Sequence, residues 1–296
     1  MKTKSKKLYK GDTIGIISPS GAVKEIELFN NAVKYFESKG FKVKTAPHAL
    51  DKNDYLAGND TDRLNDLVIF FNDPEIKAIF CSRGGYGAFR ILDKIPTLPP
   101  KIFVGYSDIT ALLYNFNFVT FHGPLAVSDF GKENINTYTE DIFWKILENN
   151  VEIPYSFPNP YEYHCIKPGT TEGILIGGNL SIICGLLGTP YSLNFDNKIL
   201  LIEDVCEPLY KIDRMLAQLR LAGVFNKLAG VLFAEFTDVN ALELITEYSK
   251  DLNIPIGYGF PAGHSEQKAT LPLGVKYLFD SENFKLALTE DYLTIS

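Results

Sequence analysis

The segment Lys101-Ile-Phe-Val-Gly-Tyr-Ser-Asp-Ile-Thr-Ala-Leu-Leu113 changes, within two residues, from the pattern of a buried strand to the pattern of a helix. Ser107 lies at this junction. A tight strand-to-helix turn exposes a serine Oγ at the carboxyl edge of a sheet, beside the first N–H groups of the helix. The segment therefore predicts a nucleophile with oxyanion donors next to it.

The same junction also permits a purely structural interpretation. The spacing Gly105-Tyr106-Ser107-Asp108 lacks the second glycine of the usual G-x-S-x-G turn. Ser107 or Asp108 would then be a helix N-cap that accepts a hydrogen bond from the first turn. Other residues have to decide between nucleophile and cap.

Strand and helix patterns alternate through the first half of the chain, which predicts parallel β-α-β units. In order, the pattern gives a strand at 13–17, a helix from 26 to a cap at Gly40, a strand at 41–45, a helix at 62–71, a strand at 76–82, a helix at 88–92, and the Ser107 strand and helix. Ligands of open α/β sheets bind beyond the carboxyl ends of the strands. The loop Arg83-Gly-Gly-Tyr-Gly87 and residues 106–108 stand at such ends.

The glycine loop has two interpretations. Its backbone N–H groups, next to a candidate nucleophile, are the components of an oxyanion hole. Alternatively, Gly84 and Gly85 only serve a turn that needs positive φ angles.

The second half begins after a polar, aromatic stretch, 131–169, which we interpret as an interdomain connection. Within it, Thr137-x-x-Glu140 predicts a capping box at the start of a helix. Strands are then expected at 173–178, 198–205, 230–235, 275–279 and 284–289, with helices ending at 187, before Gly223 and near 252.

Two residues of the second half are candidates for acid–base chemistry. Glu203, followed by Asp204, ends an apolar strand; such a carboxylate either lies at a site or marks where the strand reaches water. His264 lies in the loop Phe260-Pro-Ala-Gly-His-Ser265 and is either solvated or a general base. Because triads are defined by roles and not by chain order, Ser107, Glu203 and His264 together satisfy the composition of one.

Bulk composition excludes several classes of protein. The 296 residues are 46% hydrophobic and 13% aromatic, which supports packed cores and excludes a disordered or fibrous chain. The net charge of −7 argues against nucleic-acid binding, which needs clustered cations. The basic residues before Gly11 are followed by an apolar stretch that stops at Ser18-Pro19, too short for an export signal. We expect no export and no membrane span.

Cysteine and histidine spacing predicts neither disulfides nor metal. The chain has four cysteines and no C-x-x-C pair; Cys81, Cys184 and Cys206 lie in or beside apolar runs and are expected to be buried, reduced thiols. The four histidines are scattered, without H-E-x-x-H or other ligand spacing.

Taken together, these segments resemble the serine LD-carboxypeptidase family, which includes muramoyltetrapeptide carboxypeptidases and microcin C self-immunity hydrolases. The match runs nearly end to end. It covers Gly11-Asp-Thr-Ile-Gly-Ile-Ile-Ser-Pro-Ser20, Arg83-Gly-Gly-Tyr-Gly87, Val104-Gly-Tyr-Ser-Asp-Ile-Thr-Ala-Leu112, His122-Gly-Pro124, Gly177-Gly-Asn-Leu180, Leu201-Ile-Glu-Asp204, Ile212-Asp-Arg-Met-Leu216, and Gly263-His264 with Thr270-Leu-Pro-Leu-Gly274.

The resemblance implies an α/β protein of two domains. A flavodoxin-like N-terminal domain over 1–130 would carry the nucleophile, and a smaller swivelling-type α/β domain over 170–296 would carry the other two members of the triad, so that the active site would lie between them. Ser107 would be the nucleophile, His264 the general base and Glu203 the residue that orients His264.

The family also implies roles for neighbouring residues. The backbone N–H of Asp108 and one from Gly84 or Gly85 would bind the oxyanion. Arg83 and Tyr86 would contact substrate, although Arg83 is as well explained by an ion pair that holds its loop. The stretch 265–268 matches no family motif.

The implied reaction removes the terminal D-alanine of a muropeptide tetrapeptide during cytoplasmic cell-wall recycling, without cofactor or metal, in a homodimer. The intact loop from Arg83 to Gly87 resembles the carboxypeptidase branch, and Trp144, the one tryptophan, is expected to pack as core and not to stack on a nucleobase. Two alternatives stay open. The same triad could cleave a peptidyl- or aminoacyl-nucleotide, or the chain could be a non-catalytic small-molecule binder in which Ser107 is a cap.

Overall fold

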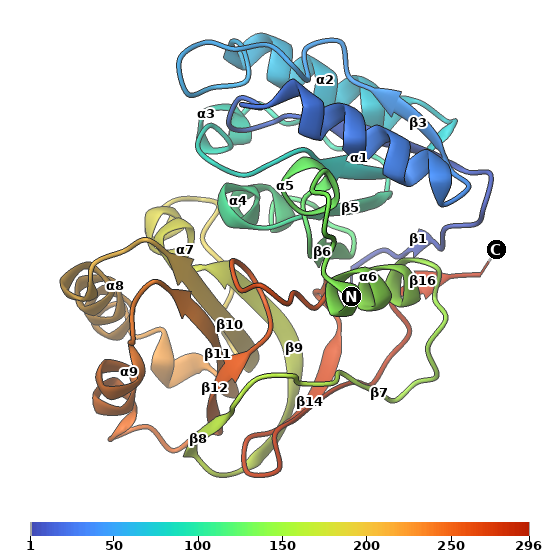
Figure 1. Cartoon of the computed structure of the whole chain (residues 1–296). Helices are drawn as coiled ribbons and strands as arrows, with labels where there is room; N and C mark the ends of the chain where they lie inside the picture. Colours follow the sequence, from blue (N-terminus) through green and yellow to red (C-terminus); the bar gives the residue numbers. More distant parts are fainter. Residues whose placement is uncertain (1, 296) are drawn as a thin grey trace. The chain divides into compact units, whose positions relative to one another are not determined.

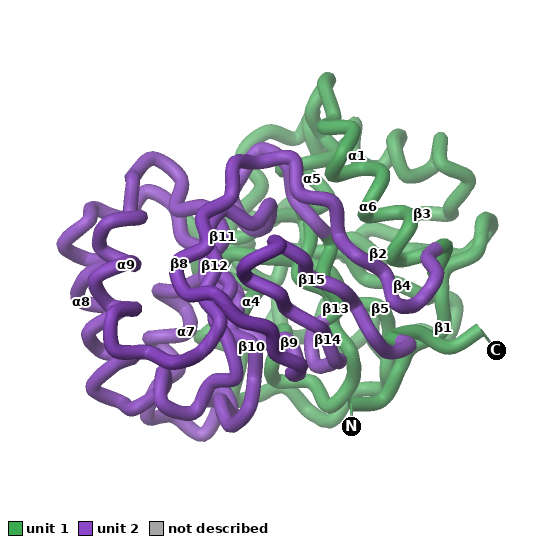
Figure 2. Tube along the Cα trace, turned by 90° about the horizontal axis from the view of Figure 1, so that it is seen from below, with its two compact units in different colours: residues 1–150, 270–272, 292–296 green, residues 151–269, 273–291 purple. Residues whose placement is uncertain are grey.

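The computed structural model describes residues 2–295, which form two compact units. Unit 1 comprises residues 1–150, 270–272 and 292–296, and unit 2 comprises 151–269 and 273–291 (Figure 2). Each unit has its own sheet (Figure 1). Two short segments, 270–272 and 292–296, therefore belong to unit 1, although the first interrupts unit 2 in sequence and the second follows it.

Unit 1 contains a six-stranded sheet in the order β13-β6-β5-β4-β2-β3. Its strands are β2 (Thr13–Ile17), β3 (Lys42–Thr45), β4 (Ile76–Cys81), β5 (Ile102–Gly105), β6 (Thr120–His122) and β13 (Leu271–Leu273). The five strands from β2 to β6 pair in parallel. Their order is the flavodoxin-like one, and the topological switch point lies between β2 and β4. The predicted flavodoxin-like fold is confirmed.

Helices connect these strands, as the alternating pattern predicts. They are α1 (Ile26–Ser38), α2 (Asp60–Asn72), α3 (Phe89–Leu92), the 3₁₀ helix η1 (Ser107–Ile109), α4 (Thr110–Leu113), α5 (Ala126–Phe130) and α6 (Thr137–Leu147). A two-stranded parallel sheet of β1 (Ser5–Lys6) and β16 (Leu293–Thr294) joins the two ends of the chain.

Helix α6 begins differently from the prediction. The side chain of Asn136, not of Thr137, caps the helix by accepting the N–H of Thr139 at 3.1 Å. Glu140 does not complete a capping box; its carboxylate accepts the hydroxyl of Tyr35 at 2.7 Å and pairs with Lys39 at 2.6 Å. The capping box was therefore wrong by one residue, because asparagine is a stronger N-cap than threonine.

The core of unit 1 is aromatic on the side of α1. Phe36 of α1 is fully buried, and its ring centroid lies 5.2 Å from that of Phe80 and 5.3 Å from that of Phe130. Trp144 stacks on Phe41 at 4.9 Å, and its indole N–H donates to the hydroxyl of Tyr35 at 2.8 Å. Trp144 therefore packs in the aromatic cluster as predicted, but it lies at the edge of this cluster and stays partly exposed.

Unit 2 contains an eight-stranded mixed sheet in the order β7-β15-β14-β9-β10-β11-β12-β8. The strands are β7 (Tyr155–Ser156), β8 (His164–Lys167), β9 (Thr170–Asn179), β10 (Lys198–Val205), β11 (Gly230–Thr237), β12 (Ile256–Phe260), β14 (Lys276–Asp280) and β15 (Lys285–Leu288). The helices are α7 (Leu180–Leu186), α8 (Leu209–Leu221), the 3₁₀ helix η2 (Phe225–Lys227) and α9 (Leu242–Ser249). Only β9 to β12 pair in parallel; the outer pairings are antiparallel.

The structure corrects two further expectations. β12 is a full strand, although Gly257 and Gly259 masked its strand pattern in the sequence. Cys206 is exposed, because the chain turns out of β10 at this residue with a φ of 55°; Cys81 and Cys184 are buried free thiols as predicted. Over the described part of the chain, no helix combines the length and the apolar character that crossing a membrane requires.

Replacing Phe36 by alanine is expected to destabilise unit 1 strongly. The ring is 0% exposed, so its removal leaves a cavity among other aromatic rings; such changes cost about 3–5 kcal/mol. Urea unfolding followed by the fluorescence of Trp144, which belongs to the same cluster, measures the loss. Ile26→Ala on the same helix, at a residue that is 59% exposed, is the control and should change the unfolding free energy by less than about 1 kcal/mol. Equal losses in the two variants would contradict this description of the core.

Candidate active site

Ser107 has the backbone of a strained turn and not of a helix cap. Its φ is +64°, a left-handed conformation that residues with a side chain rarely adopt. β5 ends at Gly105 and η1 begins at Ser107, so the serine lies at the carboxyl end of a parallel strand. The first turn is not capped by a side chain, and Tyr106 occupies the N-cap position. Strain of this kind persists mainly at functional sites, which favours the nucleophile over the cap.

The glycine loop that follows β4 lies against this serine. A Cβ placed on Gly84 would lie 2.6 Å from the Cβ and 2.7 Å from the Oγ of Ser107, so only glycine fits there. Gly85 has a φ of +111°. Within residues 2–295, no acceptor takes the N–H of Gly84 or of Gly85. The loop therefore brings unused backbone donors next to the candidate nucleophile, as an oxyanion hole requires.

Glu203 is fully buried inside β10, with 0% of its side chain exposed. The alternative that this carboxylate marks where the strand reaches water is thereby excluded. On one side β10 pairs in register with β9, where Glu203 lies opposite Asn179. On the other side the pairing with β11 shifts between Ile202 and Asp204. Irregularities of this kind redirect side chains beside active sites.

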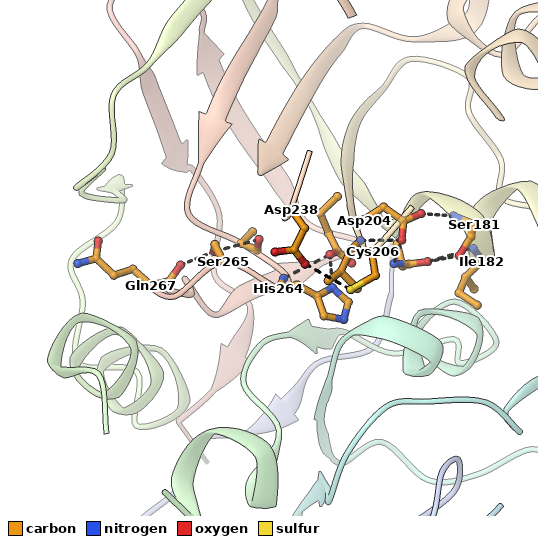
Figure 3. A network of polar contacts seen from close by, with 12 residues as sticks. Ser181, Ile182, Asp204, Cys206, Asp238, His264, Ser265 and Gln267 are labelled. Carbon is orange, nitrogen blue, oxygen red and sulfur yellow. Dashed lines mark hydrogen bonds and ion pairs between the residues drawn. The ribbon is translucent and has the colours of Figure 1, made fainter. Parts of the chain in front are cut away.

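His264 is held by this carboxylate. Its Nδ1 lies 2.7 Å from Oε2 of Glu203, and its backbone N–H lies 3.3 Å from the same oxygen (Figure 3). A neutral imidazole that donates from Nδ1 carries its basic lone pair on Nε2. The imidazole keeps 18% of its exposure. Glu203 thus fixes both the orientation and the tautomer that a general base needs.

The loop that carries His264 is itself braced. Gly263 has a φ of +73°, and a Cβ at this position would overlap the carboxyl group of Glu203. The N–H of Gln267 donates to the hydroxyl of Tyr161 at 2.7 Å, and the hydroxyl of Ser265 donates to the carbonyl of Gln267 at 2.6 Å. These contacts give the stretch 265–268, which matched no motif, a structural role in unit 2.

Asp204 forms a second polar network beside the pair (Figure 3). Its carboxylate accepts Nδ2 of Asn179 at 2.9 Å, the N–H of Ser181 at 3.0 Å and its neighbour's N–H, from Val205, at 2.9 Å. Burial raises the pKa of the Asp204 carboxyl to about 6. Asp204 therefore ties the start of α7 to β10, directly behind Glu203.

The remaining predicted residues lie in unit 1. Arg83 donates from Nη1 to the carbonyl of Ala22 at 2.7 Å, so its loop is held by a hydrogen bond and not by the ion pair considered from the sequence. Tyr86 is exposed, and its ring packs edge to face on Tyr55 with centroids 5.6 Å apart. Their contact with substrate stays a prediction. Ser107 and Asp108 also belong to unit 1, whereas the Glu203–His264 pair belongs to unit 2.

Family models match both halves of the chain. The LD-carboxypeptidase N-terminal domain matches residues 14–123, and the LD-carboxypeptidase C-terminal domain matches residues 172–278. The chain belongs to the LD-carboxypeptidase family. The residues that the matches cover include Ser107, the glycine loop, Glu203 and His264, so each candidate lies within a recognised domain of this enzyme family.

Individual relatives represent two activities. A Bacillus subtilis protein named "Probable murein peptide carboxypeptidase" is 36% identical, over 92% of this chain and 90% of its own. The microcin C7 self-immunity protein of Escherichia coli is 30% identical, over 96% of this chain and 95% of its own. A structure of a microcin C7 self-immunity protein in the apo state has a TM-score of 0.90 at 27% identity, and the match covers 98% of this chain and 99% of that one. The muramoyltetrapeptide carboxypeptidase of Oxalobacter formigenes has a TM-score of 0.79 at 28% identity, covering 95% and 100%.

Potential metal ligands lie apart from these residues. Among residues 2–295, one group of three, His48, Asp51 and Asp62, offers ligand atoms within 4.8 Å of one another. His48 is already engaged through Nδ1 with Asp66 at 2.8 Å. The group shares no residue with the predicted site.

Gly263→Ala is expected to disturb the Glu203–His264 pair. The new methyl group meets the carboxyl group of Glu203, whereas Gly223→Ala, at a similar φ of +70° with nothing within 4 Å, adds the same backbone strain without the clash. Gly223→Ala should lose about 1–2 kcal/mol of stability from the backbone strain alone, and Gly263→Ala should lose more, because the clash adds to the strain. Only Gly263→Ala should move or abolish the Nδ1 proton resonance of His264 in an NMR spectrum. An unchanged resonance in Gly263→Ala would refute the proposed steric role.

The titration of Asp204 should make stability depend on pH. Its pKa is raised from 3.8 to about 6 in the folded protein, so the folded state binds the proton more tightly than the unfolded chain. The free energy of unfolding should then fall as the pH rises from 3.8 to about 6, and it should level off above this range. Asp204→Asn lacks this titration. Urea unfolding of both proteins across this pH range, followed by circular dichroism, should show their difference changing with pH; parallel profiles would contradict the assignment.

Proposed function

We propose that the chain is a serine LD-carboxypeptidase that releases the terminal D-alanine of a muropeptide tetrapeptide, with Ser107, His264 and Glu203 as its triad. The observation that carries the proposal is the 2.7 Å contact between Nδ1 of His264 and the fully buried carboxylate of Glu203. A histidine oriented in this way is what a serine nucleophile requires. Ser107, with its strained backbone at a strand end, is the serine that suits it.

The proposed reaction proceeds through an acyl-enzyme. Ser107 Oγ attacks the carbonyl carbon at the L-centre of the diamino acid while Nε2 of His264 takes the hydroxyl proton. The C–N bond then breaks, and His264 returns the proton to the amino group of the departing D-alanine. A water molecule, deprotonated by His264, attacks the ester and releases the shortened peptide. Throughout, Glu203 stabilises the imidazolium ion through Nδ1–H.

The oxyanion of each tetrahedral intermediate would be bound by backbone donors. The N–H of Asp108 belongs to the first turn of a helix, where N–H groups lack an intrahelical acceptor. The second donor would come from Gly84 or Gly85, whose loop lies against Ser107. Such donors contribute to the rate because they are already oriented when charge develops.

The substrate class is supported by the family and not by the geometry alone. Relatives named murein peptide and muramoyltetrapeptide carboxypeptidase cover almost the whole chain. We therefore place the reaction in cytoplasmic recycling of cell-wall peptides, with Arg83 and Tyr86 as candidate contacts to the substrate. We also propose a homodimer, which light scattering of the purified protein would test.

A second candidate substrate follows from the similarity to the microcin C7 self-immunity protein. The same triad would then cleave an aminoacyl or peptidyl nucleotide. The packing of Trp144 in the aromatic cluster of unit 1 favours the carboxypeptidase, because its ring is stacked on Phe41 and the ammonium group of Lys10 lies over it, 4.9 Å from its centroid.

Incubation with muropeptide tetrapeptides tests the proposal. The wild-type protein should release D-alanine, measured by chiral amino-acid analysis, and Ser107→Ala, His264→Ala and Glu203→Gln should each lose most of the activity, about 10⁶-fold for the first two and about 10⁴-fold for the third. Parallel assays with peptides that contain diaminopimelate or lysine would identify the preferred diamino acid.

Ser38→Ala is the matched control, since Ser38 lies at the exposed end of α1, where its hydroxyl donates to the carbonyl of Tyr35. It should retain full activity. Absence of D-alanine release by the wild type, or undiminished release by Ser107→Ala, would contradict the proposal. Faster cleavage of an aminoacyl sulfamoyl adenosine than of every tetrapeptide would instead establish the second candidate.

A further inference from the structure

The side chain of Asp108 joins three loops at the carboxyl edge of the unit 1 sheet. Its Oδ2 accepts the N–H of Ala88 at 2.9 Å and also the hydroxyl of Ser20. Asp108 follows β5, Ala88 ends the glycine loop after β4, and Ser20 lies in the loop after β2. The carboxylate therefore connects three strand ends across the topological switch point, where ligands of such sheets bind.

Asp108 is buried, with 1% of the residue exposed, and it belongs to a larger polar network. Arg63, also buried, donates from Nη1 to the carbonyl of Ser20 at 3.4 Å and pairs through Nη2 with Asp60 at 2.5 Å. Burial raises the pKa of the Asp108 carboxyl, and the hydrogen bonds from Ser20 and Ala88, with the positive charge of Arg63, oppose this shift. A buried carboxylate that accepts two hydrogen bonds specifies the geometry of its partners, because leaving either donor unsatisfied costs free energy.

The glycine loop is consequently fixed at both of its ends. Near its start, the carbonyl of Gly84 accepts the N–H of Gly21 at 3.1 Å. At its far end, the N–H of Ala88 is held by Asp108. Gly84, which lies against Ser107, is itself the first of these fixed points, and Gly85 lies between the two. The residue that holds the far end is the one that directly follows Ser107 in the chain.

We propose that the Asp108 carboxylate is a positioning residue for hydrolysis: it holds the glycine loop at the distance from Ser107 that oxyanion binding requires. The inference rests on the proposed function and adds to it, since the family resemblance assigns to Asp108 only a backbone N–H. The carboxylate acts through Ala88 and Ser20 and does not itself touch the reacting atoms.

A positioning role predicts an effect on the kinetic constants that a purely structural role does not predict. If the carboxylate positions the oxyanion donors, its loss should lower kcat, which depends on transition-state stabilisation, and leave KM nearly unchanged. Misplacement of a catalytic group by about 1 Å costs about a hundredfold. A carboxylate that only stabilised the fold would lower the fraction of folded protein and leave the kinetic constants of the folded enzyme intact.

The experiment compares Asp108→Ala, Asp108→Asn and Asp66→Ala. Asp66 is the matched control: it is also a buried carboxylate that accepts a backbone N–H and a side-chain donor, at 3.0 and 2.8 Å, but both come from His48. For each variant, kcat and KM for D-alanine release, the rate of labelling of Ser107 by a fluorophosphonate, and the midpoint of thermal unfolding are measured.

We expect Asp108→Ala to lower kcat and the labelling rate by about a hundredfold with little change in KM. Asp108→Asn, which keeps an oxygen acceptor at the same place, should recover most of both rates. Asp66→Ala should lower the unfolding midpoint and leave kcat unchanged. Should Asp108→Ala fail to fold, Ser20→Ala removes one of the two bonds while the carboxylate stays, and it should shift kcat in the same direction by a smaller factor.

Two results would overturn the inference and leave the proposed function intact. The first is a wild-type kcat and labelling rate in Asp108→Ala, or in Ser20→Ala if Asp108→Ala does not fold. The second is a loss of activity in Asp108→Ala that equals the loss in Asp66→Ala and is not recovered by Asp108→Asn. The proposed function fails in a different way. If wild-type protein neither releases D-alanine nor is labelled at Ser107, the triad is wrong and the positioning role falls with it. Labelling at Ser107 without D-alanine release would refute only the substrate, and the labelling rates would still test Asp108.

Discussion

The hydrogen bond between His264 and the buried carboxylate of Glu203 is the contact on which the functional account depends. A carboxylate with no exposure is costly unless it is hydrogen-bonded, and the 2.7 Å bond to Nδ1 meets this requirement while it fixes the imidazole. Gly263 is needed because any side chain there would overlap the carboxyl group. The glycine at position 263 and the buried carboxylate of Glu203 thus act together to fix the position of His264.

Unit 1 carries the proposed nucleophile, Ser107. Parallel strands end at one edge of the sheet, and the chain turns sharply there from β5 into η1, with Ser107 at a φ of +64°. The strain of that conformation is offset by surroundings that hold it in place. Gly84 packs against the serine, and the carboxylate of Asp108 binds the neighbouring loops. Each half of the chain therefore holds its candidate residues in place within its own fold.

Much of this could be predicted from the sequence, because the informative patterns were local. The alternation of strand and helix predicted the flavodoxin-like order, and the junction at Ser107 predicted the turn. Contacts between residues distant in the chain could not be predicted from the residues themselves: Glu203 looked like any carboxylate at a strand end, and its partner lies 61 positions away. The role of Ser20 was missed for the same reason, since 88 positions separate it from Asp108.

Errors arose where chemically similar residues compete or where a turn redirects a side chain. Asn136 caps α6 in place of Thr137, because asparagine is the stronger N-cap of these two neighbouring residues. Cys206 follows an apolar run but lies outside, because the chain leaves β10 at this position. Strand β12 was not predicted because its two glycines weaken the strand pattern in the sequence. In the structure, parallel pairing with β11 stabilises this strand.

The central claim is that Ser107 and the Glu203–His264 pair act as one catalytic unit. A double-mutant comparison of kcat for D-alanine release tests it most directly, with Ser107→Ala, His264→Ala and the protein that carries both changes. Residues that act as a unit give losses that do not add, so the double variant should be no slower than either single variant, within about threefold. Losses that multiply in the double variant would show that the two residues act independently and would contradict the account.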